Sequence, residues 1–355
     1  MKHYFFIEEK ICKYLHDKLG IFNKLIQSII MSLSIGQYAV KPPIFLAPMA
    51  GITDLPFRRV VSRFGTGHFV TEMIASQEIL SGRPGVRQKA ELGVDTSYTS
   101  VQISGRDPYA ISETAKLVEG LGAKIIDLNM GCPAKKVVNG YAGSALLKDI
   151  PLASKLIEAV VNSVSVPVTL KTRLGWNDDD LNAATLAKVA EQLGVKLITI
   201  HARTRCQFYK GYARWKLLKN VKENVSIPVI VNGDISDTNS AKTALKESTA
   251  DGLMVGRAIR GRPWLLNEIA ADLWGFQKYN LVGSGSLTEL IVSHYEDILS
   301  FYGNELGVRV ARKHLGWYME YGGVLSEDRR SILTEEIPKK VLSKLKTVFE
   351  FREAA

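Results

Sequence analysis

Eight short apolar runs recur along the central part of the chain, and helical patterns follow several of them. The apolar runs occupy residues 44–48, 69–73, 98–103, 125–129, 167–172, 197–201, 228–232 and 250–255. The helical patterns occupy residues 109–121, 152–164, 182–193 and 240–246. Eight parallel strands that alternate with helices close into a (β/α)8 barrel, and their strands are apolar throughout because both faces are buried. The sequence therefore predicts an α/β fold of the TIM-barrel type.

An open, doubly wound sheet is the alternative architecture for alternating strands and helices. Such sheets often carry the pattern G-x-G-x-x-G directly after the first strand, where it binds a dinucleotide. The first apolar run is followed instead by the segment APMAGITD at residues 47–54. The absence of the glycine pattern at this position favours the barrel.

Composition and periodicity divide the chain into four segments. Residues 1–33 form an N-terminal extension with a helical pattern, which either caps the barrel, binds a partner or precedes a true translation start at Met31. The barrel is expected over 34–275, and a linker over 276–286, where the sequence contains YNLVGSGS. Helical patterns at 287–304, 307–321 and 334–352 predict a small all-helical C-terminal domain over 287–355.

The charge balance favours an anionic partner. Lys and Arg outnumber Asp and Glu by 46 to 36, a net charge of +10, and the surplus lies between residues 41 and 283. Such a surplus is typical of proteins that bind nucleic acid, although it also serves solubility.

The cysteines and the hydropathy indicate a cytoplasmic protein. The three cysteines lie far apart without a C-x-x-C pair, which argues against a disulfide framework and a zinc ribbon. No secretory signal, membrane-spanning run or metal-binding motif is recognised. We therefore expect neither a membrane partner nor a bound metal.

The loop after the fourth apolar run carries the sharpest candidate for chemistry. Cys132 lies between Gly131 and Pro133, where a thiol is exposed enough to donate a proton, although most cysteines are only small buried hydrophobes. Asn129, at the end of the run, either binds a planar heterocycle or holds its own loop.

Other strand ends also carry small or polar residues, and in a closed barrel all these ends face one pocket. The first six contribute Pro48, Met49, Ala50, Gln102, Lys171, Arg173, His201 and Arg203. The last two contribute Asn232, Gly233, Asp234, Gly256 and Arg257. Glycines there let backbone N–H groups approach a phosphate, unless both segments are ordinary turns. A flavin fits this set, with its phosphate near Arg257 and its ring near Gln102 and Lys171.

Several segments together resemble the tRNA-dihydrouridine synthases, and the bacterial B-type branch most. They are APMAGITDLPFR (47–58), VQISGRDP (101–108), DLNMGCPAKKV (127–137), GSALL (143–147), KTRLGW (171–176), HARTRCQ (201–207), VNGDI (231–235) and ADGLMVGRAIRGRPW (250–264). The resemblance covers about residues 34–320. It implies an FMN enzyme that reduces the C5–C6 double bond of a D-loop uridine in tRNA, with NADPH as the electron donor.

The resemblance also implies roles for individual residues. Cys132 would protonate C5 after hydride reaches C6, Asn129 would contact the uracil, and His201 would face the flavin or the uracil. The flavin contacts would be Pro48, Met49, Ala50, Gln102, Lys171, Asn232, Gly233, Asp234, Gly256 and Arg257. The tRNA contacts would be Lys135, Lys136, Arg203, Arg205, Arg309, Arg312 and Lys313. Ala202 departs from the family pattern, in which many relatives place glycine.

Two rival functions stay open at this point. A tRNA-binding chaperone would keep the barrel without catalysis, and a flavin reductase of free pyrimidines would resemble the dihydroorotate dehydrogenases. The possible catalytic thiol argues against the first, and the basic rim with its helical domain argues against the second. We expect a monomer. The sequence does not specify which D-loop uridine is reduced, nor whether NADPH is preferred to NADH.

Overall fold

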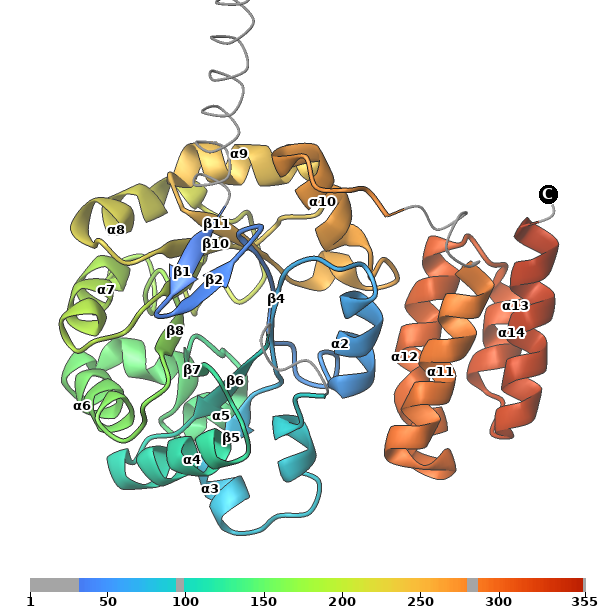
Figure 1. Cartoon of the computed structure of the whole chain (residues 1–355), viewed down its shortest axis with the longest axis horizontal. Coiled ribbons are helices and arrows are strands. Elements are labelled where there is room, and N and C mark those ends of the chain that lie inside the picture. The colour runs from blue at the N-terminus through green and yellow to red at the C-terminus, as the bar shows by residue number, and fades with distance from the viewer. Residues whose placement is uncertain (1–31, 94–98, 280–286, 354–355) are drawn as a thin grey trace, which may run out of the picture.

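The computed structural model describes residues 32–93, 99–279 and 287–353. The predicted helix within residues 1–31 and most of the predicted linker lie outside these ranges. The elements of the described part are a small hairpin, a barrel and a group of C-terminal helices (Figure 1).

Eight parallel strands form a closed ring. They are β3 (Ile44–Leu46), β4 (His68–Val70), β6 (Thr99–Ser104), β7 (Ile126–Met130), β8 (Val168–Arg173), β9 (Ile198–His201), β10 (Val229–Asn232) and β11 (Gly252–Val255). Strand β3 pairs with β11 on one side and with β4 on the other, and β4 pairs with β6, which closes the ring. Each strand lies within or beside one of the predicted apolar runs. The predicted TIM barrel is therefore confirmed.

Helices surround this ring. They are α2 (Leu55–Ser62), α3 (Ser76–Leu80), α4 (Pro108–Gly120), α5 (Lys135–Asn139), α6 (Ile150–Val161), α7 (Ala183–Gln192), α8 (Leu218–Asn224), α9 (Thr238–Ser248) and α10 (Leu265–Trp274). Aspartates define several starts: Asp54, Asp107, Asp149 and Asp237 each accept a hydrogen bond from a backbone N–H in the first turn. The four predicted barrel helices correspond to α4, α6, α7 and α9.

The strands are apolar because the barrel buries them on both faces. Every residue of β6, β7, β9, β10 and β11 is buried. Their inner side chains fill the barrel, and their outer side chains pack against the helices in one continuous core. A two-residue strand, β5 (Ile74–Ala75), pairs with the end of β6, beyond the residues that pair with β4.

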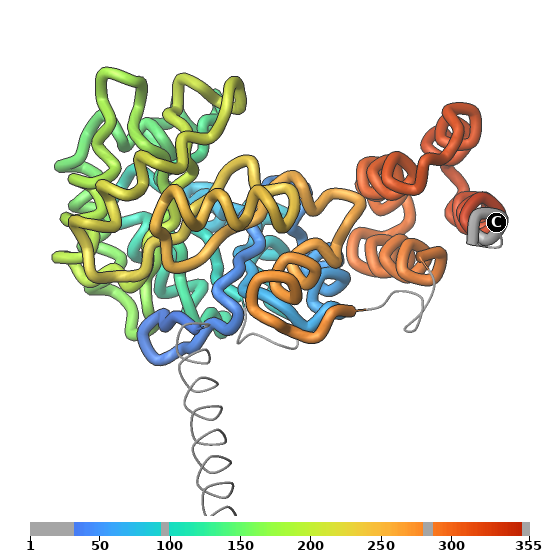
Figure 2. Tube along the Cα trace, turned by 90° about the horizontal axis from the view of Figure 1, so that it is seen from above, coloured from blue at the N-terminus to red at the C-terminus, as the bar shows by residue number. Residues whose placement is uncertain are grey.

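A hairpin that the sequence analysis missed lies at the amino ends of the barrel strands. It consists of β1 (Leu33–Ile35) and β2 (Tyr38–Val40), which pair antiparallel. Its buried side chains pack with Ile125 and Leu197, the residues that precede β7 and β9. Figure 2 shows the hairpin at one end of the barrel, with the long connections after β8 and β9 at the other. The hairpin therefore covers the amino ends of the strands and not their carboxyl ends.

Four helices follow the barrel and lie beside it: α11 (Leu287–Tyr302), α12 (Asn304–Tyr321), α13 (Ser326–Leu333) and α14 (Pro338–Glu353) (Figures 1 and 2). The predicted helical region is confirmed. Helix α13 was not predicted, because it is short and polar and buries only Ile332.

Helix α2 of the barrel joins the two parts. Val60 and Phe64 share a buried cluster with Ile291 and Leu315 of the C-terminal helices. Polar contacts flank this cluster: the Tyr302 hydroxyl donates to Oδ2 of Asp54 at 2.9 Å, and Arg59 pairs with Asp297 at 2.7 Å. Apolar burial at the centre and ion pairs at the rim hold the helices against the barrel.

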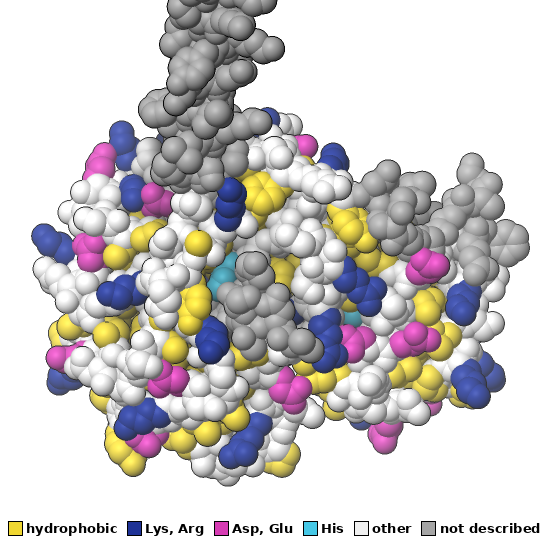
Figure 3. All heavy atoms as spheres, in the orientation of Figure 1, with side chains coloured by type: hydrophobic (Ala, Val, Ile, Leu, Met, Phe, Trp, Pro, Cys, Tyr) yellow, Lys and Arg dark blue, Asp and Glu magenta, His cyan; other side chains and the backbone are white. Residues whose placement is uncertain are grey.

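Two surface properties bear on the possible partners. In the described ranges, no helix is both long enough and apolar enough to cross a membrane. On the face that carries the hairpin, Lys and Arg side chains are scattered and interspersed with Asp and Glu (Figure 3). This face shows no single basic patch.

Candidate active site

A cavity of about 680 Å³ opens at the carboxyl ends of the barrel strands. The volume lies within the usual range for cofactor and substrate pockets. The structure brings fourteen of the predicted site residues to its wall: Pro48, Met49, Ala50, Gln102, Asn129, Cys132, Lys171, His201, Arg203, Asn232, Gly233, Asp234, Gly256 and Arg257. The predicted convergence of the strand ends is therefore observed.

The loop that carries Cys132 is held from both sides. Its carbonyl oxygen accepts from the backbone N–H of Ser144 at 3.1 Å and from the Ser144 hydroxyl at 2.9 Å. Gly143 has a φ of 61°, and a Cβ there would lie 2.9 Å from the same carbonyl oxygen. A glycine is therefore required beside the half-buried thiol.

Asn129 holds this loop, which is one of the two roles predicted for it. Its Oδ1 accepts the N–H groups of Gly131 at 3.2 Å and Cys132 at 2.9 Å. Its Nδ2 donates to Oε1 of Gln102 at 2.8 Å. The side chain is 9% exposed and also lines the cavity, so loop support does not exclude a ligand contact.

The Gln102 amide is held in turn by a residue that the sequence analysis missed. Its Nε2 donates to Oδ2 of Asp127 at 2.7 Å, and the Thr169 hydroxyl donates to the other oxygen at 2.6 Å. Burial raises the pKa of the Asp127 carboxyl, while these two hydrogen bonds oppose the rise. A carboxyl group in the middle of an apolar run was the available signal, because a buried acid requires partners.

Lys171 extends from β8 into the cavity and donates to Oδ1 of Asn232 at 3.1 Å. The Asn232 Nδ2 donates to the carbonyl oxygen of Met254 at 2.8 Å, which fixes the orientation of this amide. Burial, aided by the nearby Arg173 guanidinium, lowers the pKa of Lys171 to about 8. The ammonium group can therefore lose its proton more easily than a surface lysine.

His201 is a neutral hydrogen-bonding group in this wall. Burial, followed by the positive charges of Arg173 and Lys171, lowers its pKa well below the usual value. Its ring lies close to Gly233, where an added Cβ would meet Cδ2 at 2.8 Å. Gly233 has a φ of 115°, so both its backbone conformation and the lack of room for a Cβ require glycine.

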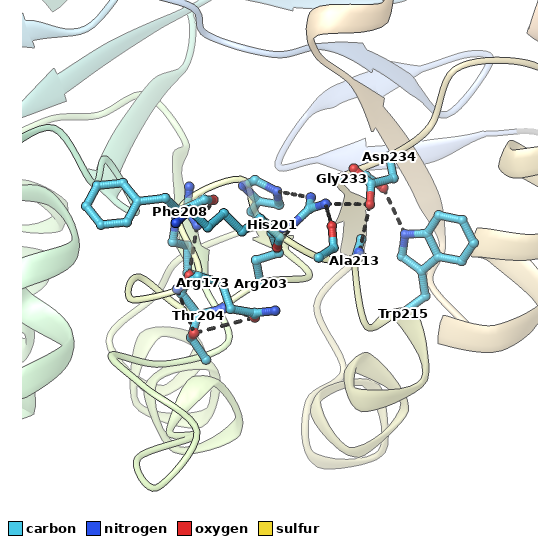
Figure 4. Close-up of polar contacts among 12 residues, drawn as sticks. Arg173, His201, Arg203, Thr204, Phe208, Ala213, Trp215, Gly233 and Asp234 are labelled. Carbon is cyan, nitrogen blue, oxygen red and sulfur yellow. Dashed lines mark hydrogen bonds and ion pairs between the residues drawn. The ribbon is translucent and has the colours of Figure 1, made fainter.

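Arg173, at the end of β8, connects the loops that follow the two neighbouring strands, β7 and β9. Its Nε donates to the carbonyl oxygen of Gly131 at 2.9 Å, and its Nη1 donates to those of Thr204 and Phe208 at 2.9 Å each (Figure 4). The side chain is almost fully buried. Sequence analysis placed it at a strand end but assigned it no function.

Arg203, one of the predicted tRNA contacts, is buried in the cavity wall. The residue is 2% exposed, and its Nη2 pairs with Oδ2 of Asp234 at 2.6 Å (Figure 4). It also donates to the carbonyl oxygens of Lys210 and Gly211. An arginine two residues beyond a strand can point outward or fold back, and here the ion pair with Asp234 and the two carbonyl acceptors direct it inward.

The other predicted tRNA contacts lie outside the cavity wall. Lys135 and Lys136 are exposed, and Lys136 pairs with Glu78 at 2.9 Å. Arg205 is half-buried, with its guanidinium carbon 4.6 Å from the ring centres of Trp176 and Phe208.

On α12, only Arg309 of the three predicted contacts is exposed, whereas Arg312 and Lys313 are half-buried. The ammonium of Lys313 lies 3.5 Å from the position of a Cβ on Gly51, at the junction with the barrel. The three residues therefore do not form one exposed basic stripe.

The described residues contain no group of three or more His, Cys, Asp or Glu side chains that could hold a metal ion. The polar groups of the cavity instead form hydrogen bonds and ion pairs with one another. Its basic residues outnumber the acidic ones, since Asp234 is the single carboxylate among the described lining residues. The cavity therefore suits an anionic organic ligand.

Residues 45–348 match the protein family described as Dihydrouridine synthase (Dus). A probable tRNA-dihydrouridine synthase of Rhodobacter capsulatus is 50% identical over 326 residues, which cover 92% of this chain and 100% of that protein. The tRNA-dihydrouridine synthase B of Pseudomonas syringae pv. tomato is 44% identical over 288 residues, covering 81% of this chain and 86% of that protein.

A solved structure with the same barrel supports the fold alone. A chain of the 2-naphthoyl-CoA reductase complex aligns with a TM-score of 0.54 at 13% identity, covering 68% of this chain and 52% of that chain. The family match, by contrast, includes both the barrel and most of the C-terminal helices. The chain belongs to the dihydrouridine synthase family of flavin-dependent oxidoreductases.

Proposed function

We propose that this protein binds FMN and uses NADPH to reduce the C5–C6 double bond of a D-loop uridine in tRNA. The observation that carries the proposal is the placement of the Cys132 thiol on the same cavity wall as Lys171, Gln102 and Asn129. A proton donor and several hydrogen-bonding groups thus face one space large enough for a cofactor and a base.

The cavity residues fit FMN. Gly233 and Gly256 line the cavity where β10 and β11 end, and Arg257 supplies positive charge beside them. Asp234 does not oppose a phosphate, because Arg203 neutralises its carboxylate. Pro48, Met49, Ala50, Gln102, Lys171, His201 and Asn232 would line the remainder of the cofactor.

When bound, the reduced flavin supplies the hydride that adds to C6 of the uracil. Cys132 donates the proton to C5, which removes the negative charge that hydride addition leaves on the base. Asn129 hydrogen-bonds the base. Lys171 and His201 add two hydrogen-bonding groups to the cavity wall, and burial lowers the pKa of each. Arg173 holds the Cys132 loop in place through Gly131.

The uridine must leave the folded tRNA to reach this cavity, as in other enzymes that act on a flipped base. Lys135, Lys136, Arg205 and Arg309, which lie outside the cavity wall, would contact tRNA phosphates. Residues 34–275 form the catalytic unit, and residues 287–355 form a tRNA-binding unit beside it. We propose a monomer that works in the cytoplasm.

Purified protein tests this proposal directly. A yellow protein that oxidises NADPH only when unmodified tRNA is added, and that leaves dihydrouridine in the tRNA, is the expected result. A protein that takes up no FMN would be a tRNA chaperone at most. One that reduces free uracil or orotate as well as it reduces tRNA would instead belong with the small-molecule reductases.

A further inference from the structure

A chain of side-chain hydrogen bonds crosses three neighbouring strands and ends at the Cys132 loop. Which group donates and which accepts at each step is fixed at that end. The N–H groups of Gly131 and Cys132 can only donate, and both donate to Oδ1 of Asn129. The Asn129 Nδ2 must therefore face Gln102, which receives it on Oε1 at 2.8 Å. The Gln102 Nε2 then faces Asp127 at 2.7 Å.

Asp127 imposes the same direction from the other end. Its Oδ2 accepts from Gln102, and its Oδ1 accepts from the Thr169 hydroxyl at 2.6 Å. Only 3% of the residue is exposed, so no solvent can replace these partners. Oδ2 stays an acceptor whether the carboxyl is ionised or carries a proton on Oδ1. The chain therefore has one stable direction.

The direction decides what Asn129 can offer to a ligand. Its Oδ1 already accepts two hydrogen bonds, and one Nδ2 hydrogen is used by Gln102. A side-chain amide has two N–H groups, so a single N–H is left for the cavity that Asn129 lines. The site presents a donor at this point and has no free acceptor.

We propose that Asp127 is a positioning residue that, through Gln102, holds Asn129 as an obligate hydrogen-bond donor, so that the pocket selects a uracil carbonyl and rejects a cytosine amino group. The proposal rests on the proposed function for the presence of a pyrimidine in the cavity. A carbonyl oxygen accepts the Asn129 N–H, whereas an amino group would place two donors against each other. Sites with fixed hydrogen-bonding groups discriminate strongly against ligands that cannot pair with them.

The substitution Asn129→Asp reverses the group offered to the base while preserving its shape. The new carboxylate still accepts the two backbone N–H groups, but its second oxygen meets Oε1 of Gln102. If the Gln102 amide rotates to relieve this contact, its oxygen meets Asp127 instead. The single substitution therefore leaves two oxygens facing each other in either orientation of the Gln102 amide.

Adding Asp127→Asn completes the reversal. The new amide at position 127 donates to Gln102, Gln102 donates to the new carboxylate at position 129, and Thr169 still donates to the remaining oxygen at position 127. Every member is again paired, with the chain running in the opposite direction. A matched control is Asn267→Asp, which changes another buried asparagine that donates to Thr66 at 3.0 Å and does not line the cavity.

Thermal unfolding of the full-length chain tests the direction without any catalysis. We expect Asn129→Asp to lower Tm and Asp127→Asn, added to it, to restore much of the loss. Asp127→Asn should restore nothing to Asn267→Asp, because these sites share no partner. Strictly additive losses for Asp127→Asn and Asn129→Asp would overturn the positioning role.

Tests with tRNA transcripts address the choice of base. Two unmodified transcripts are compared, one with its natural D-loop uridines and one with cytidines in their place, by following the return of flavin absorbance after reduction. The wild-type protein should favour uridine by about 10-fold to 100-fold. The variant with both substitutions should lose this preference or invert it, and an unchanged ratio would overturn the proposal. A wild-type protein inactive on both transcripts would contradict the proposed function, while the unfolding experiment would still decide the direction of the chain.

Discussion

Arg173 donates a hydrogen bond from Nε to the carbonyl oxygen of Gly131 at 2.9 Å, and this contact links the Cys132 loop to the end of the neighbouring strand β8. The same guanidinium holds the loop after β9 through Thr204 and Phe208. Because it is buried and rigid, this planar group fixes two loops relative to each other. The position of the Cys132 thiol therefore depends on Arg173.

We expect Arg173→Lys to reduce dihydrouridine formation by about 100-fold, because a lysine cannot reach three carbonyl oxygens at once. The lost hydrogen bonds should also lower the free energy of unfolding by about 2–4 kcal/mol. Steady-state kinetics and denaturant unfolding measure the two effects. Arg262→Lys is the control, since the half-buried Arg262 pairs with Glu268 outside the cavity, and equal losses in both variants would contradict the assigned role.

Lys171 makes stability depend on pH. Its pKa is lowered from 10.5 to about 8 in the folded protein, so the unfolded chain binds the extra proton between these pH values. The flavin-free protein should therefore gain stability from Lys171 deprotonation as pH rises through this window, by about 3 kcal/mol at most. Lys171→Met, which lacks this charge, should be the more stable protein near pH 7, and the difference in free energy of unfolding from the wild type should shrink as pH rises. A difference that stays constant from pH 7 to 10 would refute the prediction.

Replacement by alanine should affect stability at Arg203 and tRNA binding at Lys135. Arg203→Ala removes a buried guanidinium that pairs with Asp234 and donates to two carbonyl oxygens, and should lower the free energy of unfolding by about 3 kcal/mol. Lys135→Ala should leave stability unchanged, weaken tRNA binding and reduce its salt dependence. Unfolding curves, together with binding measured at two salt concentrations, separate these outcomes. An Arg203→Ala protein of normal stability would restore the original view of this residue as a rim contact.

Gly143→Ala should displace the Cys132 loop. The residue has a φ of 61°, and a Cβ would meet a Val137 methyl at 2.8 Å and the Cys132 carbonyl oxygen at 2.9 Å. We expect a loss of about 2 kcal/mol in stability and a lower kcat, with flavin reduction by NADPH little changed. Gly120→Ala is the control, because nothing lies within 4 Å of its Cβ position and its φ is not positive. Similar kcat values for both variants would argue against a strict loop geometry.

Sequence analysis predicted those parts of the site that follow from the topology. Once eight strands close into a barrel, Gln102, Cys132 and Lys171 at their carboxyl ends must converge. The direction of a long side chain depends on partners that are distant in sequence, so the burial of Arg203 against Asp234 was not foreseen. Asp127 was missed because its role follows from Gln102 and Thr169 on the neighbouring strands, and the sequence does not show which side chains a buried acid contacts.

Elements outside the barrel pattern were harder to predict for related reasons. The β1–β2 hairpin is very short, and its burial comes from residues before the barrel strands, such as Leu197. Helix α13 buries a single side chain, Ile332, so it carries little apolar periodicity. Short elements that derive their stability from tertiary contacts leave weak local signals.

The central claim is that Cys132 supplies the proton that completes uracil reduction. The most direct measurement compares wild type with Cys132→Ala, with FMN bound, in single-turnover reactions on unmodified tRNA after reduction by NADPH. Both proteins should accept electrons from NADPH at similar rates, and only the wild type should convert uridine to dihydrouridine rapidly, with at least about a 100-fold difference. If Cys132→Ala forms dihydrouridine at the wild-type rate, Cys132 is not the acid and the central claim is wrong.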